Sequence, residues 1–549
     1  MSTYLTLGDF GKKVSTQSAE CQLLINNGLL QMFGFNHEEA IRCFKKSLTY
    51  DKNCAMAHYF IAYSNAANYN NPVGLDYGAA YKETKLAMEK AKQGNVSEWE
   101  MALIKAQQHR FCWPPNSKPL EVLNKNYANK MRSVYRKFGL ADADITTFFA
   151  ESLMVLEPWK LWTPAPEYKP GIPETMELVS VLEKALKAYP NHPGLCHFYI
   201  HTMELSATPE KALPAADSLR TSAFEQGHLI HMPGHIDMWV GRYCEAIETS
   251  KKGIAVDQLY MKETGHDIEF YKMYRMHNYH FTVWAAMFDG QYATAIMYAE
   301  ESEKQLGPET ISFMVEDVAV GACYLEPFTC LPWHVLIRFG KWEEIISRPL
   351  KEDKDMYASA TTTAHYARAI AFAVTGRLKE ADKERSKFYT ALHSKALIGR
   401  SLLHNAMHDP ERHNGILDVA EAVMNGEVEY HKGNVQEAFK CLRLAAHRDA
   451  NLVYDEPWGW MMPVKHVIGA LLVEQGKPAD AEVVYRQDLA HYKNNLWSLR
   501  GLHQTLEQQG KTDEAELTLK AFEKASARSD INLYASCLCA TKLCCRKTT

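Results

Sequence analysis

"GRYCEA" occupies residues 241–246, and close variants of it recur along the chain. Each variant starts with glycine and ends on a small or apolar residue: "GQYATA" at 290–295, "GKWEEI" at 340–345, "GRLKEA" at 376–381, "GNVQEA" at 433–438, "GKPADA" at 476–481 and "GKTDEA" at 510–515. "GFNHEEA" at 34–40 is one residue longer. Flanking apolar residues follow helical spacing, so each glycine is expected to end one helix and each alanine to lie early in the next. The sequence predicts an all-α fold of helical hairpins.

This recurrence resembles the tetratricopeptide (TPR) repeat, in which helix-turn-helix units pack with a small residue at the close crossing. Successive glycines from Gly241 onward are separated by 49, 50, 36, 57, 43 and 34 residues, which predicts insertions between units. Each hairpin buries one face against its neighbours, so the array is expected to form a superhelical solenoid with a concave groove. Because insertions separate the units, this solenoid can also be closed and compact.

Composition excludes several functional classes. The 549 residues are 46% hydrophobic and 23% charged, with a formal net charge of −5. Nucleic acid and acidic membrane surfaces need a clustered basic field, so neither is expected as a partner. There is no apolar run of transmembrane length, and the N-terminus does not read as a signal peptide, which makes a cytoplasmic location the default expectation.

Four segments are expected: N-terminal helical repeats (1–190), central histidine-rich repeats (191–300), C-terminal helical repeats (301–530) and a cysteine-rich tail (531–549). Nine of the thirteen cysteines are scattered singly along the chain. These nine are expected to be reduced, buried thiols. The tail carries Cys537, Cys539, Cys544 and Cys545, which could bind metal, form disulfides or fray. Their spacing lacks the CxxC pattern that indicates zinc.

The chain also resembles a tetratricopeptide-like family, widespread in bacteria and present in eukaryotes, that is marked by an "HMPxHI" motif. The resemblance covers nearly the whole chain, with its motif in "GHLIHMPGHIDMWVGRY" at 227–243 and further matches in "NHPGLCHFYIHTMELSATPEKALPAADSL" at 191–219, "MHNYHF" at 276–281 and "EPWGWMMPVKHVIGALL" at 456–472. Gly234 replaces the usual serine or alanine, and Tyr59 and Phe60 replace a tryptophan–glycine pair. The resemblance implies the fold and the motif but no known reaction.

The resemblance to the tetratricopeptide repeat implies a register that places histidines in the groove. With the conserved alanine of each unit at position 20, positions 2, 5 and 9 of the first helix face inward. Seven histidines, on three adjacent helices, are then expected to hold one or two metal ions: His197, His201, His228, His231, His235, His277 and His280. Helix geometry agrees, because offsets of three, four and seven residues share a face. Pro233 is expected to start a helix, leaving His228 and His231 on the approach loop.

Other residues are assigned around this centre. Glu204, Tyr274 and Asn278 are the candidate catalytic groups, with Glu204 as a ligand, a partner of the ligands or a base. Trp284, Trp458 and Trp460 are candidates for substrate binding, although tryptophans also pack between helices. His37 is expected in a turn, where it hydrogen-bonds the backbone, whereas a solenoid that curls back would bring it and His58 near the central cluster. Glu151 is another possible carboxylate of the groove.

Imidazole-rich sites suit copper, iron, zinc or nickel, and seven histidines exceed the need of one zinc ion. The sequence therefore favours copper or iron in an oxygen-activating oxidoreductase acting on a small organic substrate. A zinc hydrolase with Glu204 as base is the alternative enzyme. A non-catalytic TPR scaffold that binds a peptide or protein partner is the alternative from another class.

Overall fold

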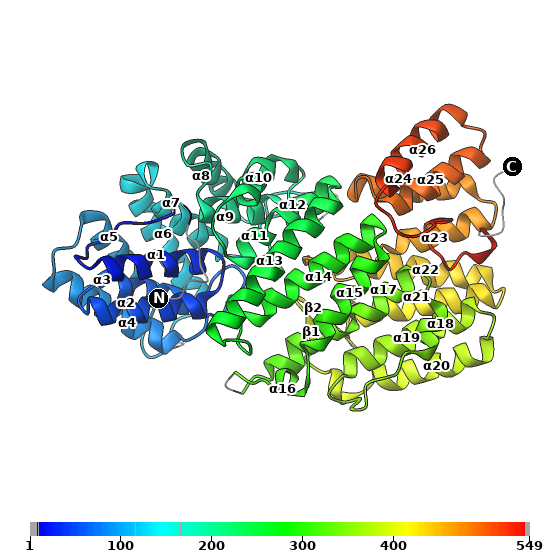
Figure 1. The fold of residues 1–549 in the computed structure, drawn as a ribbon, viewed down its shortest axis with the longest axis horizontal. Coiled ribbons are helices and arrows are strands. Elements are labelled where there is room, and N and C mark those ends of the chain that lie inside the picture. The colour runs from blue at the N-terminus through cyan, green and yellow to red at the C-terminus, as the bar shows by residue number, and fades with distance from the viewer. Residues whose placement is uncertain (1–7, 9, 116, 165–166, 316, 544–549) are drawn as a thin grey trace. The chain divides into compact units, whose positions relative to one another are not determined.

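The computed structural model describes residues 8, 10–115, 117–164, 167–315 and 317–543. The regular elements among these residues are helices, apart from two short strands of two residues each, β1 (Ser401–Leu402) and β2 (Asn405–Ala406), which pair in antiparallel fashion. It divides into two compact units, residues 1–236 with 249–275 and residues 237–248 with 276–549. The all-α prediction is confirmed (Figure 1).

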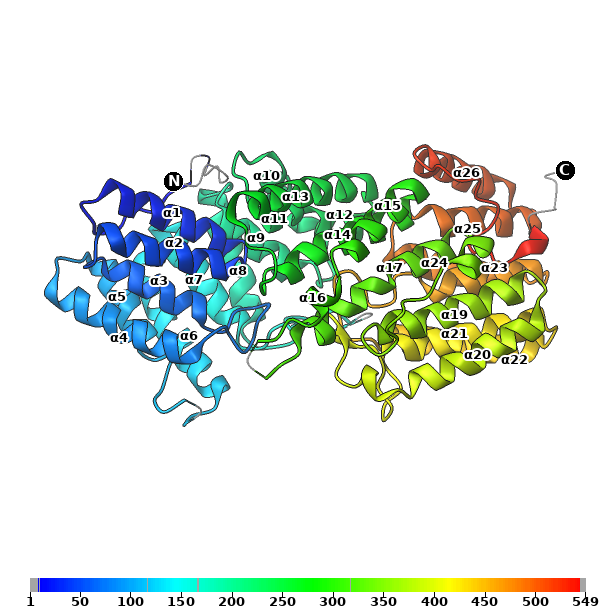
Figure 2. The same ribbon diagram turned by 60° about the horizontal axis from the view of Figure 1, so that its bottom comes forward.

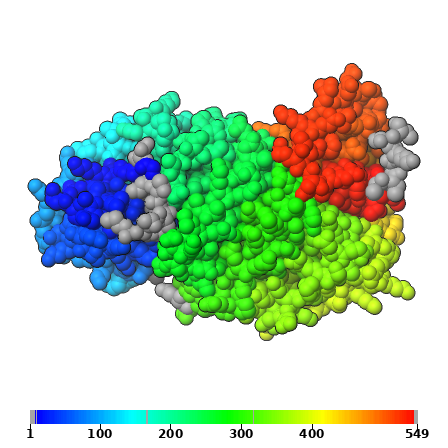
Figure 3. All heavy atoms as spheres, viewed as in Figure 1, coloured from blue at the N-terminus to red at the C-terminus, as the bar shows by residue number. Residues whose placement is uncertain are grey.

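The helices of the first unit are α1 (Ala19–Phe33), α2 (His37–Tyr50), α3 (Ala55–Asn65), α4 (Tyr77–Gln93), α5 (Glu98–Gln107), α6 (Leu120–Phe138), α7 (Ala143–Met154), α8 (Thr175–Ala188), α9 (Pro193–Met203), α10 (Leu213–Thr221) and α11 (Gly227–His231), with the 3-10 turns η1 (Gly139–Ala141) and η2 (Pro209–Ala212). Consecutive helices such as α1 and α2, or α3 and α4, pack as hairpins. Figure 3 shows the surface of the chain, with the N-terminal residues of this unit in blue.

The boundary between the units falls within α12 (Pro233–Val240), α13 (Tyr243–Thr264) and α14 (Lys272–Asp289). The second unit continues with α15 (Tyr292–Lys304), α16 (Pro308–Ile311), η3 (Gly321–Leu325), η4 (Glu326–Cys330), α17 (Leu331–Arg338), α18 (Trp342–Ser347), α19 (Ala358–Val374), α20 (Leu378–Leu392), η5 (Lys395–Leu397), α21 (Ile416–His431), α22 (Val435–Ala450), α23 (Val464–Glu474), α24 (Pro478–His491), α25 (Leu496–Gln508), α26 (Thr512–Ser526) and η6 (Thr541–Leu543). Helices α19 to α22 lie side by side in both views (Figures 1 and 2).

The recurring glycine has the predicted place in all seven six-residue repeats. Each follows the end of one helix and adopts a positive φ, from 63° at Gly340 to 88° at Gly433. Glycine takes this left-handed conformation without the steric cost that a Cβ brings, and it is the common residue after a helix C-terminus. The fifth residue after each glycine is buried against the partner helix, as Ala246 and Ala381 are. These hairpins confirm the tetratricopeptide-like prediction.

The longer repeat at 34–40 departs from this rule. Gly34 has φ −96°, and the next residue, Phe35, takes the left-handed position with φ 57°. The extra residue thus places a bulky aromatic side chain where the other turns have glycine. The Phe35 ring is buried inside the first unit, beside the central histidines.

Among the described residues, no helix is both long and apolar enough to cross a membrane.

Candidate metal centre

Five of the seven predicted histidines gather in the first unit. Helix α9 carries His197 and His201, the short helix α11 carries His228 and His231, and α12 carries His235. All five side chains are buried, at 1% exposure or less. The expectation that one HxxxH pair shares a helix face holds for α9, where the imidazole centroids of His197 and His201 are 4.8 Å apart.

The local sequence explains the break between α11 and α12. Gln226 caps α11 by accepting a hydrogen bond from the backbone N–H of Leu229. Pro233 then begins α12, because a proline at the first helical position lacks only an N–H that would have no partner in the helix. The predicted helix start at Pro233 is correct, but His228 and His231 lie on a helical turn of their own and not on a loop.

One carboxylate orients two of the imidazoles. Glu204, which follows α9, accepts a hydrogen bond from His201 Nδ1 at 2.7 Å through Oε1 and one from His235 Nδ1 at 2.8 Å through Oε2. A carboxylate accepts hydrogen bonds, so both Nδ1 atoms carry the proton and both Nε2 atoms carry a lone pair. This is the arrangement that fixes the tautomer and ring orientation of metal-binding histidines.

A third imidazole has its tautomer fixed by the backbone. His197 Nδ1 donates to the carbonyl oxygen of Phe33 at 2.6 Å, so the lone pair of His197 is on Nε2. Ligand atoms of His197, His201 and His228 all lie within 4.8 Å of one another. Three neutral imidazoles with converging nitrogens are a suitable donor set for a transition-metal ion.

His231 and His235 form a second close pair. Their Nε2 atoms are 2.8 Å apart, and His231 Nδ1 is 3.0 Å from Ser250 Oγ. Because His235 donates from Nδ1 to Glu204, the proton between the two rings belongs to His231, and Ser250 then donates to His231 Nδ1. Nitrogens bound to one ion at about 2.0–2.1 Å are about 3–3.4 Å apart, so the pair would chelate after a small movement and a shift of the His231 proton from Nε2 to Nδ1, which would then donate to Ser250.

Aromatic rings surround the imidazoles. The Phe35 ring centroid lies 4.6 Å from that of His197 and 5.7 Å from that of His228. Trp159 packs edge-on against His201 at 5.7 Å. Both Phe35 and Trp159 have positive φ, 57° and 63°, which is uncommon for bulky residues and concentrates at functional sites.

Two ionisable groups of the first unit keep their protons at neutral pH. Burial raises the pKa of Glu151, on α7, to about 8. Burial also raises the pKa of Tyr274, whose ring lies 5.1 Å from that of His228. Tyr274 and Phe35 line a small cavity of about 10 Å³ next to the cluster, large enough for about one water. The predicted catalytic residue Tyr274 thus lies beside the imidazoles.

His37 and His58 have different places in the first unit. His37 lines the same small cavity, and its Nδ1 is bonded to the carbonyl of Ser64 at 3.0 Å, while burial lowers its pKa to about 4. His58 instead pairs with Glu83 at 2.6 Å. His37 thus has the backbone hydrogen bond expected of it and shares a cavity with Phe35 and Tyr274, whereas His58 is engaged by Glu83.

The remaining two predicted ligands belong to the second unit. His280 Nε2 is 3.1 Å from Met461 Sδ, and its Nδ1 has no hydrogen-bond partner within the described part of the chain. Burial, followed by the influence of His277 and His334, holds the pKa of His280 well below its usual range. Sequence reasoning missed His334 and Met461, which have no repeat register in common with His280.

Other predicted residues of the second unit have structural surroundings. Asn278 is buried on α14, and Trp284 packs among aromatic rings, including Trp239 at 6.3 Å. Trp458 donates from Nε1 to Asp449 at 2.8 Å, whereas Trp460 lines a cavity. In the tail, Cys537 and Cys539 form a disulfide, and Cys544 and Cys545 lie outside the described residues.

Comparison with known proteins adds a weak likeness in fold. No protein-family model and no curated protein sequence matches the chain. Yeast Tom70 aligns with a TM-score of 0.33 and 10% identity, over 91% of this chain and 96% of that one. A human IFIT1 dimer with PPP-AAAA gives 0.31 and 12%, over 94% and 96%. The TPR domain of P58(IPK) gives 0.18 and 14%, over 68% and 94%. Likeness at this level carries no information on ligand or activity.

Proposed function

We propose that this chain is a metal-dependent enzyme whose centre is the histidine cluster of the first unit, His197, His201, His228, His231 and His235. The observation that supports it most is the shared carboxylate of Glu204. A buried glutamate that directs two imidazoles from different helices, with both lone pairs on Nε2, is costly to build for packing alone. This hydrogen-bonded arrangement of Glu204, His201 and His235 is suited to the binding of a metal ion.

The donor set favours copper or iron over zinc. The cluster offers five imidazoles, more than the three protein ligands of a catalytic zinc site. A hydrolase would also need a general base beside the ion, and both oxygens of Glu204 are already occupied in orienting His201 and His235. We therefore assign the activity to the class of oxygen-activating oxidoreductases acting on a small organic substrate.

Each group near the ion has a distinct task in this proposal. When bound, copper or iron supplies the redox chemistry toward oxygen. The imidazoles hold it, Glu204 fixes their orientation, and Phe35 and Trp159 exclude water. Tyr274 and Glu151, both protonated at neutral pH, hold protons within the same region of the first unit.

The decisive experiment is elemental analysis of untagged protein, followed by oxygen-uptake measurements with a panel of small organic substrates. We expect near-stoichiometric copper or iron in the parent and its loss in the His197→Ala/His201→Ala variant. His58→Ala is the matched control, because His58 is also a buried histidine but pairs with Glu83.

Three results would contradict the proposal in different ways. Zinc in place of copper or iron would favour the hydrolase. Metal retained in the double variant would place the ion elsewhere. No metal after reconstitution with copper, iron and zinc would leave the non-catalytic scaffold as the better explanation.

A further inference from the structure

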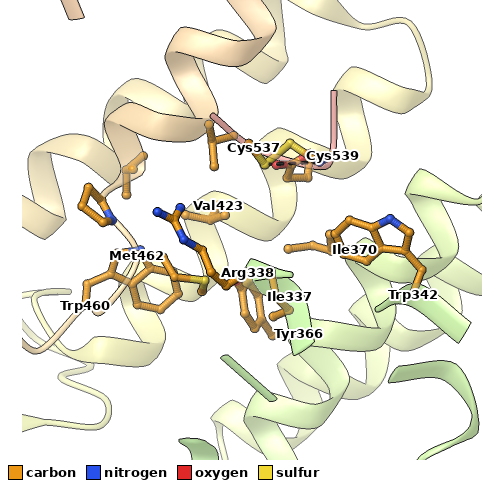
Figure 4. A pocket seen from close by; sticks show the side chains of 14 residues that line it. Ile337, Arg338, Trp342, Tyr366, Ile370, Val423, Trp460, Met462, Cys537 and Cys539 are labelled. Carbon is orange, nitrogen blue, oxygen red and sulfur yellow. Dashed lines mark hydrogen bonds between the residues drawn. A yellow bond between two sulfur atoms is a disulfide. The ribbon is translucent and has the colours of Figure 1, made fainter. Parts of the chain in front are cut away.

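The second unit contains a separate pocket, lined by apolar side chains and by the buried Arg338 and Glu427 (Figure 4). It is a cavity of about 30 Å³, large enough for about two waters. Most of its wall is apolar or aromatic: Ile337, Trp342, Tyr366, Ile370, Val423, Trp460, Met462, Pro463, Val464 and Val467. The Cys537–Cys539 disulfide closes one side, in the segment coloured red in Figure 3. Besides the cysteines and Tyr366, the ionisable side chains of this wall are Arg338 and Glu427.

Arg338 brings a positive charge into this apolar wall. Its side chain is only 6% exposed, and its Nη2 atom is buried with no hydrogen-bond partner in the described structure. The guanidinium stacks 3.6 Å from the ring centroid of Trp497, and none of the ion pairs found among the described residues includes it. A guanidinium stays protonated in proteins, so this charge is buried without a counter-ion.

Burial lowers the pKa of Arg338 and the charge of Asp488 raises it, but the carboxylate of Asp488 is already engaged. Asp488 Oδ2 accepts hydrogen bonds from His466 at 2.8 Å, Ser498 at 2.7 Å and Asn495 at 3.0 Å. Asp488 therefore does not pair with Arg338, whose Nη2 atom has no hydrogen-bond partner among the described residues.

Glu427 provides a second polar group on α21. It is 2% exposed, and its Oε2 atom has no hydrogen-bond partner among the described residues, since the nearest imidazole nitrogen, on His431, is 3.8 Å away. Burial, and then the charge of Glu474, raise the pKa of Glu427 to about 8. A carboxyl group that keeps its proton is a hydrogen-bond donor.

We propose that this pocket binds a small aliphatic carboxylate, with Arg338 pairing with its charge, Glu427 donating a hydrogen bond to it, and the apolar wall covering its carbon chain. The size of the cavity limits the buried part of the ligand to a group of a few heavy atoms. A single charged guanidinium in an apolar wall matches a monocarboxylate better than a phosphate, which requires several donors. This site lies within the second unit and does not depend on the function proposed for the histidine cluster.

The test is saturation-transfer NMR with propionate, and with propionamide as its uncharged analogue of the same shape. We expect transfer to the propionate methyl group and at least tenfold less to propionamide. Arg338→Met keeps the length of the side chain and removes the charge, so propionate binding should be lost. Arg377→Met is the control, because Arg377 also stacks on a ring, that of Phe372, but is exposed.

Variants of Glu427 test its role as donor. Glu427→Gln retains an N–H donor and should bind propionate within about threefold of the parent, whereas Glu427→Leu should lose binding. Equal binding of propionate and propionamide would overturn the proposal, as would propionate binding that survives Arg338→Met. Displacement of propionate by phosphate or chloride at equal concentration would show a general anion site. Absence of any saturation transfer would show that propionate does not bind. Either result would refute the carboxylate site.

Discussion

Glu204 shows how much a single side chain decides at the candidate metal centre. Its two oxygens accept hydrogen bonds from His201 and His235, which lie on different helices. The sequence places Glu204 three residues after His201, as a ligand, a partner or a base. The structure favours the partner role, because a carboxylate with both oxygens bonded to Nδ1–H groups directs the imidazoles and places their lone pairs on Nε2, although that of His235 accepts from His231.

Glu204→Gln should weaken metal binding by about 10–100-fold, the effect expected when the hydrogen-bond partner of a ligating histidine is lost. The glutamine amide has one acceptor oxygen, and its nitrogen cannot accept from a second imidazole N–H. Affinity is measured by competition with a chelator of known strength. Glu210→Gln, at an exposed position nearby, should bind as the parent does, and unchanged affinity in Glu204→Gln would contradict the orienting role.

The raised pKa of Glu151 should make the stability of the folded protein depend on pH. Its folded-state pKa of about 8 lies above the value of about 4.3 for an exposed glutamate, so the folded chain binds a proton that the unfolded chain releases between these pH values. The contribution of Glu151 is therefore least unfavourable below about pH 4.3 and becomes more destabilising as the pH rises toward 8.

Glu151→Gln should stabilise the protein at pH 7.5, on the order of 3 kcal/mol relative to the parent, and have little effect near pH 4.5. Melting temperatures at the two pH values measure the difference. Glu89→Gln, an exposed change on α4, serves as the control. A gain that is the same at both pH values would show that Glu151 is ionised in the folded protein.

At the scale of elements, the turn after each first helix sets the geometry of a hairpin. Gly241 and Gly376 have nearly the same φ, 75° and 78°, but different surroundings. A Cβ at residue 241 would lie 2.3 Å from the backbone oxygen of Lys493, whereas a Cβ at residue 376 would have nothing within 4 Å. The pair therefore separates the conformational cost of a left-handed alanine from the cost of a clash.

Gly376→Ala should cost about 1–2 kcal/mol, the left-handed penalty alone. Gly241→Ala should cost at least twice as much, because the carbonyl of Lys493 must also move. Thermal unfolding of both variants provides the comparison. Equal losses would mean that the backbone near Lys493 yields without cost.

Phe35 belongs to the same scale, since it takes the left-handed position in the one longer repeat. The inserted residue was visible in the sequence, but its consequence was not, because ring contacts with His197 and His228 join segments more than 150 residues apart. The periodicity of apolar residues predicts local structure, but it does not predict which distant helix a turn residue contacts.

At the scale of the whole molecule, the chain forms two units with separate candidate sites. Adding copper or iron to chelator-treated protein should slow amide hydrogen exchange in α9 and α11, because an ion that binds only the folded state stabilises the elements that hold it. Helices α23 to α26 should exchange as before. Hydrogen-exchange mass spectrometry measures this, and protection confined to α23–α26 would contradict a centre in the first unit.

The sequence by itself determined the all-α fold, the positions of the hairpin turns and the gathering of histidines on a few helices, because these follow from local spacing and from the left-handed freedom of glycine. Tertiary structure decided which imidazoles meet, that Glu204 serves two of them, and that Arg338 and Glu427 share an apolar pocket. These features depend on burial and on contacts between segments far apart in the chain. Hydrogen bonds to distant groups also fix the tautomers of the histidines, and burial shifts pKa values, which no spacing of residues can specify.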